Sequence, residues 1–134
     1  MKKYISIVLC LIFVLTLSAC GGNISETKTK PVDSKLYSEQ EISAAIETIK
    51  KEFKRNWSGC TLTTIYYAGD KTSKDYQDWA DRNDADEVIV LLSSFDVAPS
   101  GADGSLNPAS TYDKWNWILV RKDGGPWQHV DHGY

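Results

Sequence analysis

The sequence lacks every short motif that would name a reaction. It has no HExxH zinc-peptidase motif, no nucleophile elbow and no glycine-rich phosphate loop. Positive charge is also in the minority, with 15 Lys and Arg against 18 Asp and Glu. Because binding to a phosphate backbone needs a basic surface, this composition argues against a nucleic-acid partner. The sequence contains no cofactor-binding motif, so no cofactor is expected.

Long apolar runs are missing from the chain except at residues 4–16. Lys2 and Lys3 precede this run and small residues follow it, which is the layout of an export signal. A bilayer-spanning helix needs about 20 apolar residues. The run is shorter and no basic stop-transfer cluster follows it, so residues 1–19 are predicted to be a signal peptide rather than a permanent transmembrane helix.

The residues directly after the run, LSAC, end at Cys20 and resemble the lipobox of bacterial lipoproteins. The resemblance implies that Cys20 becomes the new N-terminus and carries acyl chains such as palmitate. Two or more acyl chains anchor a protein stably, whereas one chain holds it only marginally. The expected location is therefore the extracytoplasmic face of the cell membrane, with an ordinary signal peptide and an incidental cysteine as the alternative.

Cysteine is scarce in the mature chain. Cys10 leaves with the signal peptide and Cys20 is expected to carry lipid, so Cys60 remains alone and no intramolecular disulfide can form. No His or Lys is adjacent to Cys60 to lower its pKa, which indicates a small buried hydrophobe. Removing residues 1–19 takes away two lysines and no acid, which leaves 13 basic and 18 acidic residues and a formal charge of −5. Nothing in this balance favours adhesion to anionic lipid beyond the anchor itself.

The mature chain divides into a polar segment, residues 20–36, and one folded domain, residues 37–134. The polar segment shows neither helical nor alternating periodicity and is predicted to be a flexible tether that spans roughly 20 Å. The domain opens with a helix whose first turn has a capping box, Ser38 with Glu41, and a hydrophobic staple, Tyr37 with Ile42. Basic residues close this helix. They are expected to be a solvated helix end that complements the macrodipole, with an anion site as the alternative.

The remaining segments predict a second helix and four strands. Residues 60–67 are predicted to be a strand with either a bulge or burial on both faces, because Leu62 and Ile65 fall out of phase. Residues 72–83 are predicted to be a short helix that starts at a capping box of Thr72 and Asp75. Residues 87–97 are mostly apolar at both odd and even positions, as in a central strand covered on both faces. Residues 112–122 and 127–133 form a closing hairpin. This order predicts an α+β domain, with the N-terminal helix packed on a curved antiparallel sheet of about four strands.

The leading helix and the closing hairpin, WNWILVRKDGGPWQHVDHGY, resemble the NTF2-like (cystatin-like) domains of small bacterial lipoproteins of unknown function. The segments LLSSFDV and GADGSLNP also resemble extracellular parts of some membrane-bound sensor peptidases. The resemblance implies a sheet that curves around a pocket, which the helix closes on one side and which binds a ligand or a partner. No catalytic motif of the family is matched, so no catalytic residue is carried over.

The C-terminal strand contains both histidines. Strand alternation places His129 and Asp131 on one face and His132 on the other. The His129–Asp131 pair could act as a general base with an orienting carboxylate, or supply two metal ligands. No third ligand follows at a suitable spacing, so no metal site is predicted. The alternative is that both residues are ordinary exposed or hydrogen-bonded strand residues.

The aromatic residues and the long loop are the other candidates. The residues considered as lining a ligand pocket, with an ordinary core as the alternative, are Tyr66, Trp115, Trp117 and Trp127. Asp96, Asp103 and Asn107 offer oxygen atoms for calcium in and beside the loop of residues 98–111. The spacing is not that of an EF-hand, so a turn-rich loop that acts as a pocket lid or partner contact is expected.

These observations predict a membrane-anchored, extracytoplasmic, non-enzymatic module that binds a small molecule or a cell-surface protein. One alternative is a small hydrolase or isomerase that uses His129 and Asp131, with Tyr66 nearby. Another is a purely protein-interacting role through the SGADGSLNP loop.

Overall fold

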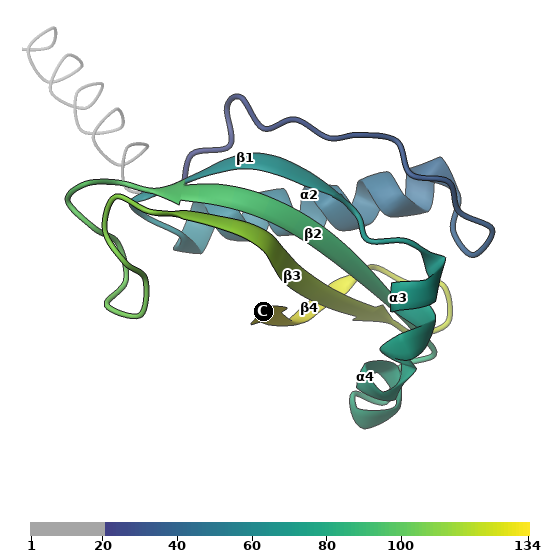
Figure 1. The fold of residues 1–134 in the computed structure, drawn as a ribbon. Helices are drawn as coiled ribbons and strands as arrows, with labels where there is room; N and C mark the ends of the chain where they lie inside the picture. Colours follow the sequence, from purple (N-terminus) through teal and green to yellow (C-terminus); the bar gives the residue numbers. More distant parts are fainter. Residues whose placement is uncertain (1–20) are drawn as a thin grey trace, which may run out of the picture.

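An open, curved antiparallel sheet in the order β1-β2-β3-β4 forms the centre of the structure (Figure 1). The computed structural model describes residues 21–134, and the predicted signal peptide and Cys20 lie outside the described residues. The strands are β1 (Cys60–Tyr67), β2 (Glu87–Val97), β3 (Thr111–Arg121) and β4 (Gln128–Gly133). The predicted α+β class is confirmed. Within residues 21–134, no helix is both long and apolar enough to cross a membrane.

The long helix α2 (Glu39–Asn56) covers one face of the sheet, as predicted. The capping box is present: the Ser38 hydroxyl accepts from the Glu41 N–H at 3.1 Å, and a Glu41 carboxylate oxygen accepts from the Ser38 N–H at 2.9 Å. Ala45, Ile49 and Phe53 are fully buried against the sheet. The basic residues of the last turn point away from this core and stay exposed or half-buried.

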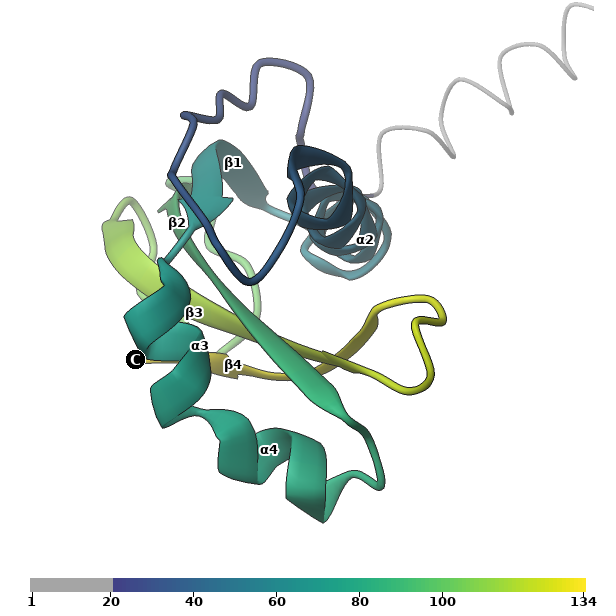
Figure 2. The ribbon, with the colours of Figure 1, turned by 90° about the vertical axis from the view of Figure 1, so that its right-hand side faces the viewer.

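The opposite face carries two short helices, α3 (Asp70–Asp75) and α4 (Gln77–Arg82), where a single helix was predicted (Figure 2). The helix is interrupted at Tyr76, whose φ of −102° and ψ of 13° are not helical. The predicted cap at Thr72 is wrong, because α3 already begins at Asp70. The Asp70 carboxylate accepts from the Ser34 hydroxyl, the Lys35 N–H and the Tyr67 hydroxyl.

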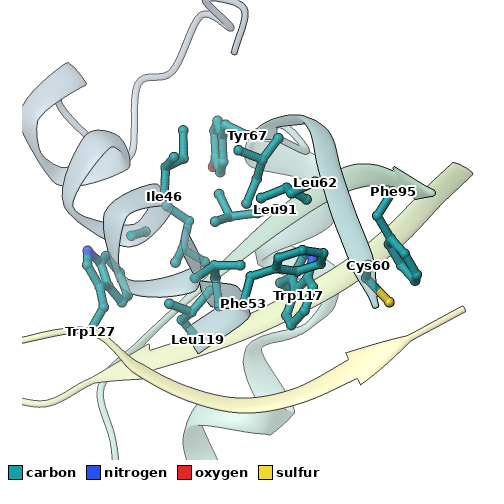
Figure 3. Packing of buried hydrophobic residues seen from close by; sticks show 14 of the residues in the cluster. Ile46, Phe53, Cys60, Leu62, Tyr67, Leu91, Phe95, Trp117, Leu119 and Trp127 are labelled. Carbon is teal, nitrogen blue, oxygen red and sulfur yellow. The ribbon is translucent and has the colours of Figure 1, made fainter. Parts of the chain in front are cut away.

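The core lies between α2 and the sheet, and a smaller cluster lies beneath α4. Phe53 of α2 meets Trp117 of β3, with their ring centroids 6.4 Å apart (Figure 3). Ile89 of β2 belongs to this main cluster, whereas Val88 packs with Ala80 on the other side of the sheet. The prediction that β2 is covered on both faces is therefore confirmed. Cys60 is buried at 3% exposure, as expected of a small hydrophobe.

A register shift interrupts each of the three strand pairings of the sheet. The shift between Leu62 and Thr64 is a bulge in β1, which is one of the two alternatives that the sequence left open. A second shift lies between Ser93 and Phe95 of β2. A third lies between Ile118 and Leu119 in the pairing of β3 with β4, and it was not predicted.

The segment of residues 21–36, expected to be a free tether, lies along β1 and is called the strap below (Figure 1). It forms isolated parallel bridges, Asn23 with Thr61 and Lys28 with Thr64. The Leu62 N–H donates to the Asn23 carbonyl at 2.9 Å. β1 is an edge strand, and its outward N–H and C=O groups need partners wherever water is excluded. The strap supplies them, which explains why a polar, aperiodic segment packs on the domain.

Candidate functional site

A cleft of about 850 Å³ opens at one end of the sheet, beside the C-terminal end of α2. Its walls come from the end of α2, the β2–β3 loop and the sheet. The end of α2 supplies Glu52, Asn56 and Trp57, the β2–β3 loop supplies Ala102, Asp103 and Leu106, and the sheet supplies Cys60, Trp115 and His132. The cleft therefore exists only once the helix, the loop and the closing hairpin have come together.

The loop wall is held in place by backbone contacts and by one carboxylate. Gly59 has a φ of +83°, and a Cβ built there would lie 2.6 Å from the Gly101 carbonyl oxygen, so glycine allows the two segments to touch. The Asp103 carboxylate accepts from the Ser105 N–H at 2.8 Å and from its hydroxyl at 3.0 Å. These bonds, first that of the backbone N–H, lower the pKa of Asp103 and favour a charged carboxylate at the cleft.

Three rings make the aromatic wall. Trp57 meets Trp115 edge to face, with centroids 6.0 Å apart, and lies 5.1 Å from the His132 ring. Behind this wall Trp57 stacks on Phe53 at 5.5 Å, which ties the wall to the core. The Trp115 Nε1 atom is enclosed and has no acceptor within the described part of the chain. An enclosed N–H donor without a protein acceptor is uncommon in folded proteins.

The histidines of β4 form a pair that the sequence analysis did not predict. Nδ1 of His132 lies 3.2 Å from Nε2 of His129, so one imidazole donates to the other. The register shift leaves Val130 as an extra residue, which reverses the alternation after it. His129 is opposite Leu119 and His132 is opposite Trp117, both on the α2 face of the sheet.

The prediction that the candidate catalytic residues His129 and Asp131 share one face of the sheet is therefore wrong. Asp131 is opposite Ile118, which belongs to the cluster beneath α4 on the other face. Burial, and then the neighbouring charge of His132, lower the pKa of His129, while the charge of Glu52, a hydrogen bond with the Asp131 backbone and the charge of Asp131 raise it by smaller amounts. The neutral imidazole is thus the favoured form of His129.

The structure does not bring the considered metal ligands together. Asp96 accepts from the Thr111 hydroxyl, Asp103 from Ser105, and the Asn107 N–H donates to the Tyr112 hydroxyl. Asp96 thus links β2 to β3, whereas Asp103 bonds within its own turn. Within residues 21–134, no cluster of three or more His, Cys, Asp or Glu side chains is arranged to hold a metal ion.

Of the four candidate pocket aromatics, Trp115 alone lines the cleft. Trp117 is fully buried and its Nε1 donates to the Ser93 hydroxyl at 2.7 Å. Trp127 is buried too, and its Nε1 donates to the Glu41 carbonyl at 3.0 Å. Tyr66 lies between the core residues of β1, on the other face of the sheet, with the Lys30 ammonium 4.1 Å from its ring centroid.

Sequence reasoning missed Trp57, which is central to the aromatic wall. It is the C-cap of α2, and its N–H donates to the Phe53 carbonyl at 3.0 Å. A tryptophan directly before a Ser-Gly helix stop was the available signal, because such a position lies at the junction of a helix end and the next strand.

Comparisons with known proteins leave the cleft to be judged by its geometry. No protein-family model matches the chain, and no curated protein or solved structure is significantly similar to it.

Proposed function

We propose that this protein is a lipid-anchored, extracytoplasmic binding module whose aromatic cleft holds a small organic ligand. The lipobox-like LSAC that ends at Cys20 supports the anchor. We also propose that the domain is NTF2-like (cystatin-like); the packing of a leading helix on a curved antiparallel sheet that ends in a hairpin supports this. Here Phe53 and Trp117 fill the centre of that concavity. The cleft consequently lies at the end of the sheet.

The observation that carries the proposal is the chemistry of the cleft lining. Trp57 and Trp115 present half-buried aromatic surface, and Glu52 and Asp103 add carboxylates. No Lys or Arg of the described residues is among the lining residues. Ligand sites typically combine such an apolar wall with a few polar groups that fix orientation. This lining suits a ring-bearing ligand and favours positive over negative charge on it.

The hydrolase or isomerase alternative gains no support from the described residues. It required His129 and Asp131 on one face, and the bulge separates them. Within residues 21–134, no carboxylate oxygen is hydrogen-bonded to either imidazole ring. A general base of the His-carboxylate type needs such an orienting bond. The other alternative, a protein contact through the β2–β3 loop, would use the same wall of the cleft.

A matched set of small probes tests ligand binding. Benzylamine, benzyl alcohol and benzoate share one ring and differ in charge, and each can be titrated while the indole N–H signals are followed by NMR. We expect benzylamine to bind most tightly and benzoate least. The signals of Trp57 and Trp115 should shift, while that of Trp79, which belongs to α4 on the other face of the sheet, should not.

Two tryptophan variants provide the control. Trp115→Ala should abolish the shifts, and Trp79→Ala should leave them unchanged. Tightest binding of benzoate, or shifts confined to Trp79, would contradict the proposed cleft.

The anchor has its own test. Cys20→Ala should release the protein from the membrane fraction or leave its signal peptide uncleaved. A cleaved Cys20→Ala product that stays in the membrane fraction would contradict acylation.

A further inference from the structure

The first two described residues lie against the last turn of α2. The Gly22 N–H donates to the Lys54 carbonyl at 3.1 Å. A Cβ on Gly21 would lie 2.0 Å from the Lys54 carbonyl oxygen, and one on Gly22 would lie 2.3 Å from that of Phe53. Both distances are well inside van der Waals contact with backbone atoms. The Gly-Gly pair therefore lets the chain pass directly over the end of the helix.

The next residues keep the chain in this position. The Asn23 N–H donates to the Cys60 carbonyl at 2.9 Å, and the strap then continues along β1. Gly21, the residue that follows the proposed anchor Cys20 in the sequence, is thus held beside the end of α2. A free tether would instead have left roughly 20 Å between the anchor and the domain and no fixed orientation.

The exposed surface at this end of α2 is basic. Lys51, Lys54 and Arg55 are exposed, and they form no ion pair with any residue of the described range 21–134. At 100° per residue, the three side chains share one side of the helix, away from buried Phe53. Glu52 falls outside this cluster and lines the cleft.

Basic side chains next to a lipid anchor are attracted to anionic headgroups, and the attraction acts within about one Debye length. We propose that the C-terminal turn of α2 is seated on an anionic lipid surface, with Lys51, Lys54 and Arg55 at the headgroups. This inference rests on the proposed anchor at Cys20. The cleft lies at the same end of the domain, beside Trp57 and Gly59. This contact of the α2 end with lipid, called the seat below, therefore holds the cleft next to the bilayer.

Fluorescence quenching on vesicles tests the seat. The lipid-anchored protein is reconstituted into vesicles that contain phosphatidylglycerol and a lipid with a nitroxide on its headgroup. A fluorophore is attached to Asn56→Cys or, in a second sample, to Gln40→Cys. Both positions are exposed on α2, and they lie about 24 Å apart along the helix axis. We expect quenching at position 56 to exceed quenching at position 40 several-fold.

Charge variants test the role of the basic residues. The triple variant Lys51→Gln, Lys54→Gln, Arg55→Gln should lose most of the difference between the two positions. Each charge near an anionic surface changes partitioning by about fivefold. The matched variant Lys71→Gln, Lys74→Gln, Arg82→Gln removes three exposed charges from α3 and α4 and should behave like the parent. Gly22→Ala should also reduce the difference, because its Cβ would displace the chain from α2.

The outcomes separate the seat from the anchor. Equal quenching at the two positions, or stronger quenching at position 40, would overturn the seat while leaving the anchor in place. A difference that is unchanged in the Lys51, Lys54 and Arg55 variant, and in vesicles of phosphatidylcholine alone, would overturn recognition of anionic lipid. A protein that does not float with the vesicles at all would overturn the anchor and the seat together.

Discussion

His129 and His132 are joined by a 3.2 Å contact between Nε2 and Nδ1, although they are three residues apart on one strand. On a regular strand an odd separation places two side chains on opposite faces. The extra residue Val130 removes this constraint, and both rings lie 5.3 Å from the ring of Trp117. β4 therefore presents a histidine pair at the edge of the aromatic wall.

The histidine pair predicts a loss of stability at mildly acidic pH. The pKa of His129 in the folded protein is lowered, chiefly by burial and then by His132. In the unfolded chain the ring titrates near about 6.5, so below that pH the unfolded chain binds more protons than the folded protein. The free energy of unfolding should therefore fall as the pH drops from about 7 through the folded-state pKa. It should be fully restored above about pH 7.

Urea unfolding at about pH 7.5 and about pH 5.5 measures this loss. His129→Gln should show a smaller decrease between the two pH values than the parent. The carboxylates of Glu52 and Asp131 oppose the effect, so their amides should enlarge it. A decrease of the same size in His129→Gln would assign the pH dependence to other groups.

Ser93→Ala should destabilise the core. The change removes the acceptor of the fully buried Trp117 Nε1, which lies 2.7 Å from the Ser93 hydroxyl. Leaving a buried donor unpaired costs about 1–3 kcal/mol. Ser94→Ala is the matched control, because its hydroxyl donates to Asp113 at an exposed site. Equal unfolding midpoints for the two variants would refute this role of Ser93.

Arg121→Met should loosen the contact between α2 and the sheet. The guanidinium pairs with Glu41 of α2 and with Glu87 of β2, the latter at 2.9 Å, and its side chain is 12% exposed. It also lies 4.4 Å from the Trp127 ring centroid. We expect a loss of about 1–2 kcal/mol, more than an exposed pair contributes. Arg82→Met, which breaks the exposed pair with Asp78, should cost less than about 0.5 kcal/mol.

The strap should protect amides of β1 from hydrogen exchange. The Leu62 and Ile65 N–H groups donate to the Asn23 and Lys28 carbonyls at 2.9 and 3.0 Å. A hydrogen-bonded amide exchanges only when its bond opens. Both amides should therefore exchange more slowly than that of exposed Ser100, when followed by NMR. Exchange of both amides at the rate of an exposed amide would instead support the prediction that residues 21–36 are a flexible tether.

Patterns that depend on neighbouring residues were predicted well. The capping box of Ser38 and Glu41 and the two-sided burial of β2 each follow from side-chain type and spacing within one segment. The same kind of pattern offered the bulge in β1 as one of two alternatives. The second helix was only partly predicted, because Asp70 takes its partners from Ser34 and Tyr67, which spacing within the helix does not reveal.

The strap and the histidine pair could not be predicted from local pattern. The strap is polar and aperiodic, and it packs because an edge strand needs backbone partners that any sequence can supply. The bulge opposite Ile118 and Leu119 depends on how two strands pair, and one extra residue exchanges the faces of all residues beyond it. This exchange overturned the pairing of His129 with Asp131.

By itself, the sequence determined the class of fold, the main helix and the strands, because periodicity and capping are encoded within each segment. The predicted export signal and Cys20 are likewise read from local sequence. The tertiary structure alone decided which side chains meet. Trp57, Trp115 and His132 come from three elements, and only the folding of α2 onto the sheet brings them to one cleft. Contacts between distant segments depend on strand register and backbone hydrogen bonding, which residue types in sequence order do not specify.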